Sequence, residues 1–86
     1  MHKNTLSLDW KTKNNKLVYE MECKNFSHAV ELINDVAKIA EKIDHHPDLH
    51  LTGYRNFRIE IYTHDSKKMT SKDFQLADHF ERLLAS

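Results

Sequence analysis

The chain has 86 residues, and its 13 Lys and Arg balance its 13 Asp and Glu, so the formal net charge is zero with histidine counted as neutral. This length allows one hydrophobic core, so we expect a single domain over residues 1–86. The balanced charge predicts no direct nucleic-acid binding, although it does not exclude a local basic patch. No apolar run approaches the roughly 20 residues of a membrane helix, so no membrane span is expected.

The first predicted element is a β-hairpin. Apolar and polar residues alternate over residues 6–10 and again from Leu17 to Cys23, a pattern typical of strands with one buried face. The polar stretch between them contains Asn14 and Asn15, which favour a tight turn. We therefore predict two antiparallel strands joined at these asparagines.

The single cysteine bears on packing and on compartment. Cys23 has no partner for an internal disulfide, and the first four residues lack the apolar segment of a secretory signal. We therefore expect a cytoplasmic protein. Cys23 falls on the apolar side of its predicted strand, which favours buried packing over a reactive thiol.

A helix is predicted after this hairpin. Ser27 is the predicted N-cap, and apolar residues then recur at steps of three and four over about four turns. Pro47 disfavours helical geometry at the residue before it, so the helix should end between Asp44 and His46. The apolar stripe consists of Ala29, Leu32, Ile33, Val36, Ile39, Ala40 and Ile43.

A second hairpin and a last helix follow Pro47. Residues 49–52 and 57–62 alternate in polarity, and the segment from Gly53 to Asn56 supplies the turn between them. Thr70 with Asp73 three positions later resembles a capping box that opens a helix. The apolar face of this helix is formed by Leu76, Phe80, Leu83 and Leu84.

The predicted order β-β-α-β-β-α indicates an α+β fold. Two hairpins and two amphipathic helices form a two-layer sandwich, with a four-stranded antiparallel sheet and both helices on one face. Such a sheet has two edges and an uncovered face, which charge or a further layer must protect. We expect a second copy of the chain to provide that layer, in a homodimer or a homotetramer.

Histidine is the unusual feature of the composition, with seven residues in the chain. Its side chain titrates nearest to neutral pH, so clustered histidines are candidates for acid–base chemistry. His2, His28 and His79 lie apart from the others and are expected to be solvated or to pack. The cluster between the first helix and the end of the second hairpin contains His45, His46, His50 and His64.

His45 and His46 can address different atoms of one ligand. Glu41 precedes His45 by four residues, the spacing at which a helical carboxylate reaches an imidazole and orients it. The restricted backbone before Pro47 should turn His46 away from its neighbour. Bound zinc or nickel is disfavoured, because adjacent histidines rarely reach one ion and no helical histidine pair or cysteine pair is present. Histidines that are simply exposed stay open as an alternative.

The histidines belong to a longer pattern. It consists of an acidic residue four before a His-His-Pro, then an aromatic, a Thr-His pair and an Asp that opens the last helix. These positions are Glu41, His45, His46, Pro47, Tyr54, Thr63, His64 and Asp73. In residue type and spacing they resemble the signature of the pterin-4a-carbinolamine dehydratases.

The resemblance implies dehydration of 4a-hydroxytetrahydropterin to the quinonoid dihydropterin in tetrahydrobiopterin recycling, without a metal or an organic cofactor. It assigns His45 and His64 to acid–base catalysis at the hydroxyl group, and His46 to holding the pterin and accepting its proton. Asp73 can cap its helix, orient a histidine, or do both. The positions expected to bind substrate are Glu41, Asp44, Pro47, Thr63, Asp65 and Asp73.

Two other functions stay open. Animal members of the family also serve as dimerisation cofactors of a homeodomain transcription factor, so a module that binds a protein partner is one alternative. A dehydratase-like protein of molybdopterin metabolism is the other. Retention of all three histidines at the family spacing favours the enzyme, because a scaffold has no need of them.

Overall fold

The structure, a computed structural model, describes residues 6–63 and 69–85. Its elements confirm the predicted order β-β-α-β-β-α. They are β1 (Lys11–Lys13), β2 (Lys16–Glu22), α1 (Phe26–Ile43), β3 (Asp48–Thr52), β4 (Asn56–Ile61) and α2 (Ser71–Ala85).

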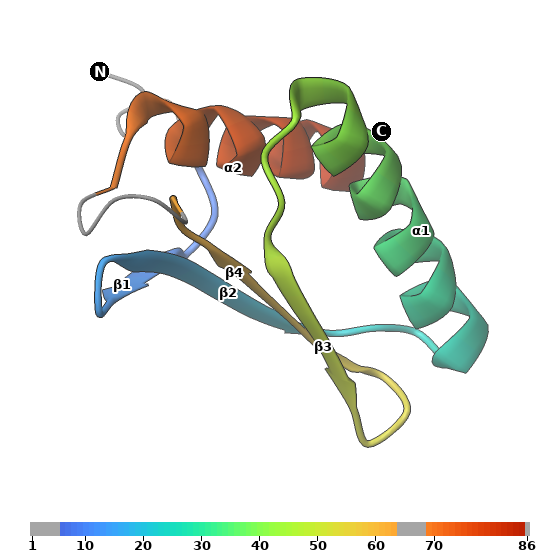
Figure 1. Ribbon diagram of the computed structural model, residues 1–86. Helices are drawn as coiled ribbons and strands as arrows, with labels where there is room; N and C mark the ends of the chain where they lie inside the picture. Colours follow the sequence, from blue (N-terminus) through green and yellow to red (C-terminus); the bar gives the residue numbers. More distant parts are fainter. Residues whose placement is uncertain (1–5, 64–68, 86) are drawn as a thin grey trace.

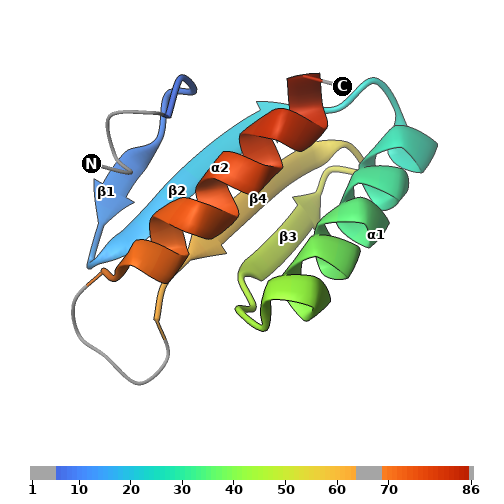
Figure 2. The same cartoon turned by 90° about the horizontal axis from the view of Figure 1, so that it is seen from above.

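The strands form one antiparallel sheet in the order β1-β2-β4-β3. Both helices lie on the same face of this sheet (Figure 1, Figure 2), so the predicted two-layer α+β sandwich is confirmed. The register places Tyr19 of β2 and Leu49 of β3 on either side of Ile59 in β4. Inward-facing residues of the three longer strands are therefore aligned beneath the helices.

The core is centred on Phe80 of α2, which is completely buried. Its ring centroid lies 5.8 Å from Trp10, 5.9 Å from Tyr19 and 5.8 Å from Phe57, distances typical of interacting aromatic pairs. Cys23 is buried as expected, and its burial raises the pKa of the thiol. Helix α1 contributes Ala29, Leu32, Val36 and Ala40 to the buried interior.

The two predicted turns are confirmed. Asn14 and Asn15 have φ angles of 52° and 63°, the left-handed conformation that two-residue hairpin turns require and that asparagine tolerates. Gly53 and Tyr54 have φ angles of 53° and 57° in the turn between β3 and β4. Over the described residues, neither helix is long and apolar enough to cross a bilayer.

Helix α1 begins two residues earlier than predicted, because its N-cap is Asn25 and not Ser27. The Asn25 side chain accepts a hydrogen bond from the N–H of His28 at 2.8 Å. His28 Nδ1 in turn accepts from the N–H of Lys24 at 2.9 Å. This reciprocal pair satisfies two backbone donors at the helix start, which Ser27 inside the helix could not do.

The segment at residues 6–10, predicted as the first strand, is not a strand, and β1 starts only at Lys11. Its alternation arises from packing, because Leu6, Leu8 and Trp10 contact the core while the residues between them are exposed. Alternation of apolar and polar residues identifies the buried side of a segment, but it does not identify the group to which the backbone of that segment is hydrogen-bonded.

That group belongs to Glu81 on α2. Its carboxylate accepts from the N–H of Ser7 at 2.8 Å, from the N–H of Leu8 at 2.7 Å and from the indole nitrogen of Trp10 at 2.8 Å. The backbone donors that a strand would direct to β2 are therefore used against α2.

The uncovered face of the sheet is polar. Glu20, Arg58 and His50 lie opposite one another on β2, β4 and β3. Glu60, two residues after Arg58, has its Oε2 atom 3.0 Å from Arg58 Nε and 3.6 Å from His50 Nε2. Antiparallel sheets commonly keep one such face in contact with water.

We expect Glu81→Gln to lower the free energy of unfolding by about 1–2 kcal/mol at neutral pH, because hydrogen bonds to a charged acceptor are lost. Burial alone would raise the pKa of Glu81, but the hydrogen bonds from Ser7, Leu8 and Trp10 hold it below its usual value. The native carboxylate therefore stabilises the fold above the unfolded pKa, and this contribution is lost as pH falls through the lower native pKa.

Urea titrations of wild type and Glu81→Gln, followed by Trp10 fluorescence, measure this difference. The gap between the two proteins should narrow below about pH 4.5. Glu31→Gln, which changes an exposed carboxylate of α1, should leave the stability nearly unchanged at both pH values. A Glu81→Gln protein as stable as wild type at pH 7, or a gap that persists in acid, would contradict this role.

Candidate active site

Three of the predicted site residues, His45, Thr63 and Asp73, meet at one end of the sandwich. The end of α1, the end of β4 and the start of α2 lie at the same end of the sheet (Figure 2). His45 and Thr63 both reach Asp73, although they are separated from it by 28 and 10 positions in the sequence. The fold therefore assembles this group from three segments.

The last turn of α1 directs His45 into the interior. Asp44, the C-cap residue, has left-handed angles of φ 55° and ψ 47°, and its N–H donates to the carbonyl of Ala40. The N–H of His45 donates to the same carbonyl at 3.1 Å, which closes a Schellman-type helix end. The chain changes direction at Asp44, and only 6% of the His45 surface stays exposed.

Asp73 lies in the first turn of α2 and is completely buried. Its Oδ1 atom is 2.7 Å from Nε2 of His45. Its Oδ2 atom accepts from the hydroxyl of Thr63 at 3.1 Å and from the N–H of Thr70 at 2.9 Å. Asp73 therefore caps the helix and contacts a site histidine with one carboxylate, the combination that the sequence had left open.

These contacts determine the tautomer of His45. An ionised carboxylate can only accept hydrogen bonds, so the ring nitrogen facing Asp73 is the one that carries the proton. The lone pair of the neutral ring then lies on Nδ1. A buried imidazole oriented in this way by a carboxylate is the arrangement used for general acid–base chemistry.

Glu41 contacts His46 and not His45, contrary to the expected pairing. Glu41 Oε2 lies 2.7 Å from His46 Nε2, and both side chains are substantially exposed. The prediction assumed that helical geometry continues through His45. Because Asp44 is left-handed, His45 leaves that helical face and His46 comes to lie beside Glu41. The two histidines thus have separate carboxylates, one buried and one at the surface.

Tyr62 and Asp48, near this end of the sheet, were not predicted from the sequence. The Tyr62 hydroxyl donates to Asp48 Oδ1 at 3.1 Å. Burial, reinforced by the hydrogen bond to Asp48 and its charge, raises the pKa of Tyr62 and keeps the phenol protonated. The outward parity of Tyr62 at the end of β4 is the signal that could have placed it near the start of β3.

Other elements of the signature lie elsewhere. Tyr54 is 60% exposed in the turn that joins β3 to β4, at the opposite end of these strands from His45. Asp44 is exposed at the helix end, and Pro47 is half-buried just before β3. The predicted residues His64 and Asp65 lie outside the residues that the structure describes.

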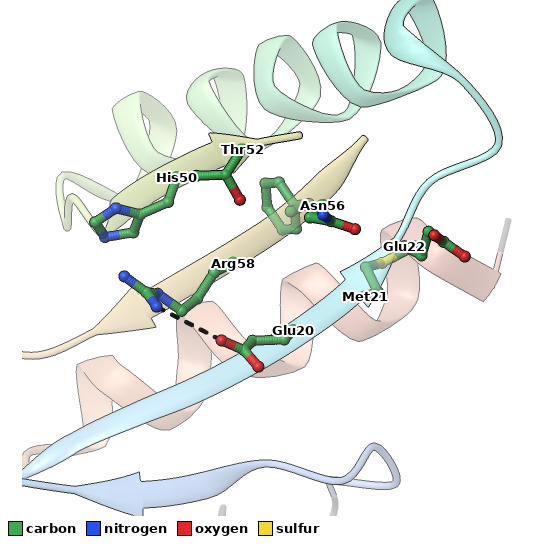
Figure 3. A pocket seen from close by; sticks show the side chains of 8 residues that line it. Glu20, Met21, Glu22, His50, Thr52, Asn56 and Arg58 are labelled. Carbon is green, nitrogen blue, oxygen red and sulfur yellow. Dashed lines mark ion pairs between the residues drawn. The ribbon is translucent and has the colours of Figure 1, made fainter. Parts of the chain in front are cut away.

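His50 lines a hollow on the uncovered face of the sheet. Figure 3 shows it beside Arg58, which pairs with Glu20 across the strands at 3.5 Å. Asn56 and Thr52 also line this hollow. His45 contacts α2, which lies on the other face of the sheet. His50 is therefore not part of the group around Asp73.

Within residues 6–63 and 69–85, no three His, Cys, Asp or Glu side chains form a group that could hold a metal ion. His45 and His46 each face a carboxylate instead. Such pairs orient imidazole rings and support proton transfer. The described geometry therefore favours acid–base chemistry.

Comparison with known sequences identifies relatives across most of the chain. The family model described as pterin 4 alpha carbinolamine dehydratase matches residues 1–83. A Picosynechococcus protein is 36% identical over 87% of this chain and 80% of its own length. A Sulfolobus acidocaldarius protein is 38% identical over 86% of this chain and 80% of its own length. Both relatives are provisionally named pterin-4-alpha-carbinolamine dehydratases.

A third relative is the mitochondrial pterin-4-alpha-carbinolamine dehydratase 2 of Arabidopsis thaliana. It is 43% identical over 79% of this chain and 36% of its own length.

Two solved structures share the fold. A transcriptional coactivator/pterin dehydratase from Brucella melitensis has a TM-score of 0.82 at 24% identity, over 94% of this chain and 86% of that chain. A pterin dehydratase-like protein, described as a RuBisCO assembly factor in the alpha-carboxysome, has a TM-score of 0.71 at 15% identity. The similarity covers 93% of this chain and 92% of the assembly factor's chain. At these identities the likeness establishes the fold alone.

Removing the buried carboxylate should be costly for stability. We expect Asp73→Ala to lower the free energy of unfolding by about 3 kcal/mol, because the His45 ring and the Thr70 N–H lose their buried acceptor. Asp78→Ala is the matched control on the same helix. Asp78 pairs with an exposed Arg82 at 3.1 Å, so its loss should cost roughly 0.5 kcal/mol. Urea titration measures both values, and equal losses would rule out a special role for Asp73 in stability.

Proposed function

The chain belongs to the pterin-4-alpha-carbinolamine dehydratase family, and from this premise we propose that it dehydrates 4a-hydroxytetrahydropterin to the quinonoid dihydropterin. We place this reaction in the cytoplasm, in tetrahydrobiopterin recycling. The observation that carries the proposal is the buried His45–Asp73 pair beside the exposed His46–Glu41 pair. Family membership supplies the reaction, and these contacts supply oriented groups that can perform it.

The reaction needs two proton transfers and no change of oxidation state. The C4a–O bond breaks, the N5–H proton leaves, a C4a=N5 double bond forms, and water is released. Hydroxide is a poor leaving group, so an acid must protonate the oxygen while a base or hydrogen-bond acceptor takes the N5 proton. Imidazole performs both tasks near neutral pH, so neither a metal nor an organic cofactor is required.

We assign His45 and His64 to acid–base catalysis at the hydroxyl group, and His46 to holding the pterin and accepting its proton. The Asp73 contact supports the assignment of His45, because it orients the ring and defines its tautomer. The Glu41 contact supports His46, which stays accessible at the surface. The role of His64 rests on the family signature.

The remaining predicted substrate-binding positions are part of the same proposal. Three of them surround the His-His pair at the end of α1, and their proximity to it supports a role in holding the pterin. The others come from the signature near the end of β4 and the start of α2. The full set is Glu41, Asp44, Pro47, Thr63, Asp65 and Asp73.

From the sequence, a second copy of the chain was expected to cover the open face of the sheet, but that face carries ion pairs and can stay in water. We therefore propose that the chain forms a homodimer or a homotetramer through α1 instead. Phe26 is 55% exposed and Val30, one helical turn later, is 36% exposed. Large apolar side chains four residues apart share one helical face, and a second copy would remove them from water. The same face could bind another protein, an alternative in keeping with the coactivator and assembly-factor descriptions of the two structural neighbours.

The purified chain should consume a synthetic 4a-hydroxytetrahydropterin faster than buffer does, as followed by ultraviolet absorbance. His45→Gln, His46→Gln and His64→Gln should each lower kcat by about 100-fold or more, because positioned acids and bases contribute at least that much. His79→Gln, which changes a half-buried histidine of α2, is the matched control and should keep the wild-type rate.

These measurements test the proposed reaction and the proposed catalytic histidines separately. A wild-type rate no better than buffer would remove the dehydratase. Activity that survives in all three variants would keep the dehydratase and reject the histidines as its catalytic groups. Thermal melting by circular dichroism shows whether each variant is folded.

Sedimentation tests the proposed assembly. Wild type should sediment as a dimer or a tetramer, and the double variant Phe26→Ser/Val30→Ser should sediment as a smaller species because the apolar contact is lost. Tyr54→Ser is the control, since Tyr54 is more exposed than either Phe26 or Val30 but lies in the turn between β3 and β4. A wild type that is monomeric at all concentrations would refute the assembly.

A further inference from the structure

We propose that the hydroxyl groups of Thr70 and Thr63 form a chain of hydrogen bonds that positions His45 through Asp73. Thr63 Oγ1 is 2.7 Å from Thr70 Oγ1 and 3.1 Å from Asp73 Oδ2. Asp73 Oδ1 is 2.7 Å from the His45 ring. The inference rests on the proposed function in one respect, because it takes His45 to be a group that the reaction uses.

The direction of the chain follows from counting protons. Thr63 has a single hydroxyl proton, and an ionised Asp73 can only accept, so this proton is donated to Asp73. The oxygen of Thr63 must then accept at its short contact with Thr70. The Thr70 hydroxyl is therefore the donor at the head of the chain, and Thr63 is both acceptor and donor. Successive bonds of this kind polarise and strengthen one another.

The chain determines which way the carboxylate faces. Asp73 Oδ2 receives the Thr63 hydroxyl and the backbone N–H of Thr70, while Oδ1 receives His45. A carboxylate held by donors on one oxygen cannot rotate freely about its last bond. The ring of His45 is then aligned by residues just after β4 and just before α2, and neither of them is hydrogen-bonded to the ring in the described structure.

Alignment of the ring matters because an acid–base group acts only within hydrogen-bond reach of the proton it moves. Small displacements of a reacting group lower rates strongly. Thr63 and Thr70 are thus positioning residues. In the described structure the Thr63 hydroxyl contacts Thr70 and Asp73, so we take its part among the substrate-binding positions to be indirect, and the loss of either threonine should affect turnover more than substrate binding. Thr63 should matter more than Thr70, because it contacts the carboxylate directly.

The first test compares variants of similar shape. Thr63→Val should lower kcat about 10-fold and Thr70→Val about 3-fold, with KM changed by less than about twofold. Thr70→Ser retains the hydroxyl and should restore the wild-type rate. Ser71→Ala, which changes the exposed first residue of α2, should have no effect. An unchanged kcat in both valine variants would overturn the proposal.

The double variant tests whether the hydroxyls act in series. Once Thr63→Val has broken the chain, Thr70→Val should cause little further loss of kcat, so the two effects should not add. Additive effects would show that the two threonines act independently and would refute the chain. If Thr63→Val does not fold, Thr63→Ala takes its place in the same cycle.

A spectroscopic measurement separates this inference from the proposed function. The Nε2 proton of His45, bonded to a carboxylate at 2.7 Å, should give a downfield proton resonance in the free protein. Thr63→Val and Thr70→Val should move that resonance, whereas Thr70→Ser and Ser71→Ala should not. If the wild-type protein has no dehydratase activity but the valine variants move the resonance, the proposed reaction is wrong and the hydrogen-bond chain stands. A resonance unaffected by either valine variant would refute the chain, whatever the activity.

Discussion

A carboxylate without exposed surface is stable only where donors replace the water it has lost, and Asp73 is in that position. Its donors come from three segments: His45 after α1, Thr63 after β4, and the backbone of Thr70 before α2. The desolvation cost of burying the carboxylate is offset most fully when all three are in place. Closure of this end of the sandwich and formation of the candidate site are therefore a single event. Stability and chemistry share the same hydrogen bonds here.

The arrangement of elements could be predicted from the sequence because apolar periodicity reports which side of each segment is buried. The period of two in β4 and the steps of three and four in α1 were sufficient for strands, helices and their order. Residues 6–10 show the limit of that signal. Their apolar side chains do face the core, but the backbone N–H groups of Ser7 and Leu8 bind the Glu81 carboxylate, which lies 73 or more positions away in the sequence. Local sequence carries no record of such a partner.

The candidate site shows the same limit in its contacts. The signature named His45, His46 and Asp73 as members of one site, and the structure brings His45 and Asp73 into contact while His46 pairs with Glu41. The expected Glu41–His45 contact failed because one residue, Asp44, adopts a left-handed conformation that ends the helical phase before His45. Pro47 indicated only that the helix must stop nearby. The Asp73–His45 contact depends on how α2 lies against the end of α1, and that geometry is decided by the packing of the whole sheet.

The attachment of residues 7–10 to Glu81 has a consequence for how this part of the chain tolerates substitution. Two of the donors are main-chain N–H groups, those of Ser7 and Leu8, which every residue except proline possesses. These main-chain bonds do not depend on side-chain identity, and proline is the one replacement that removes a main-chain donor. The Ser7 hydroxyl adds one longer bond, to Glu81 Oε1 at 3.2 Å. The indole of Trp10 is a different case, because no other side chain offers an N–H at the same reach together with a comparable apolar surface. Sequence drift in the segment should therefore be wider at Ser7, where replacement removes only the longer hydroxyl bond, than at Trp10.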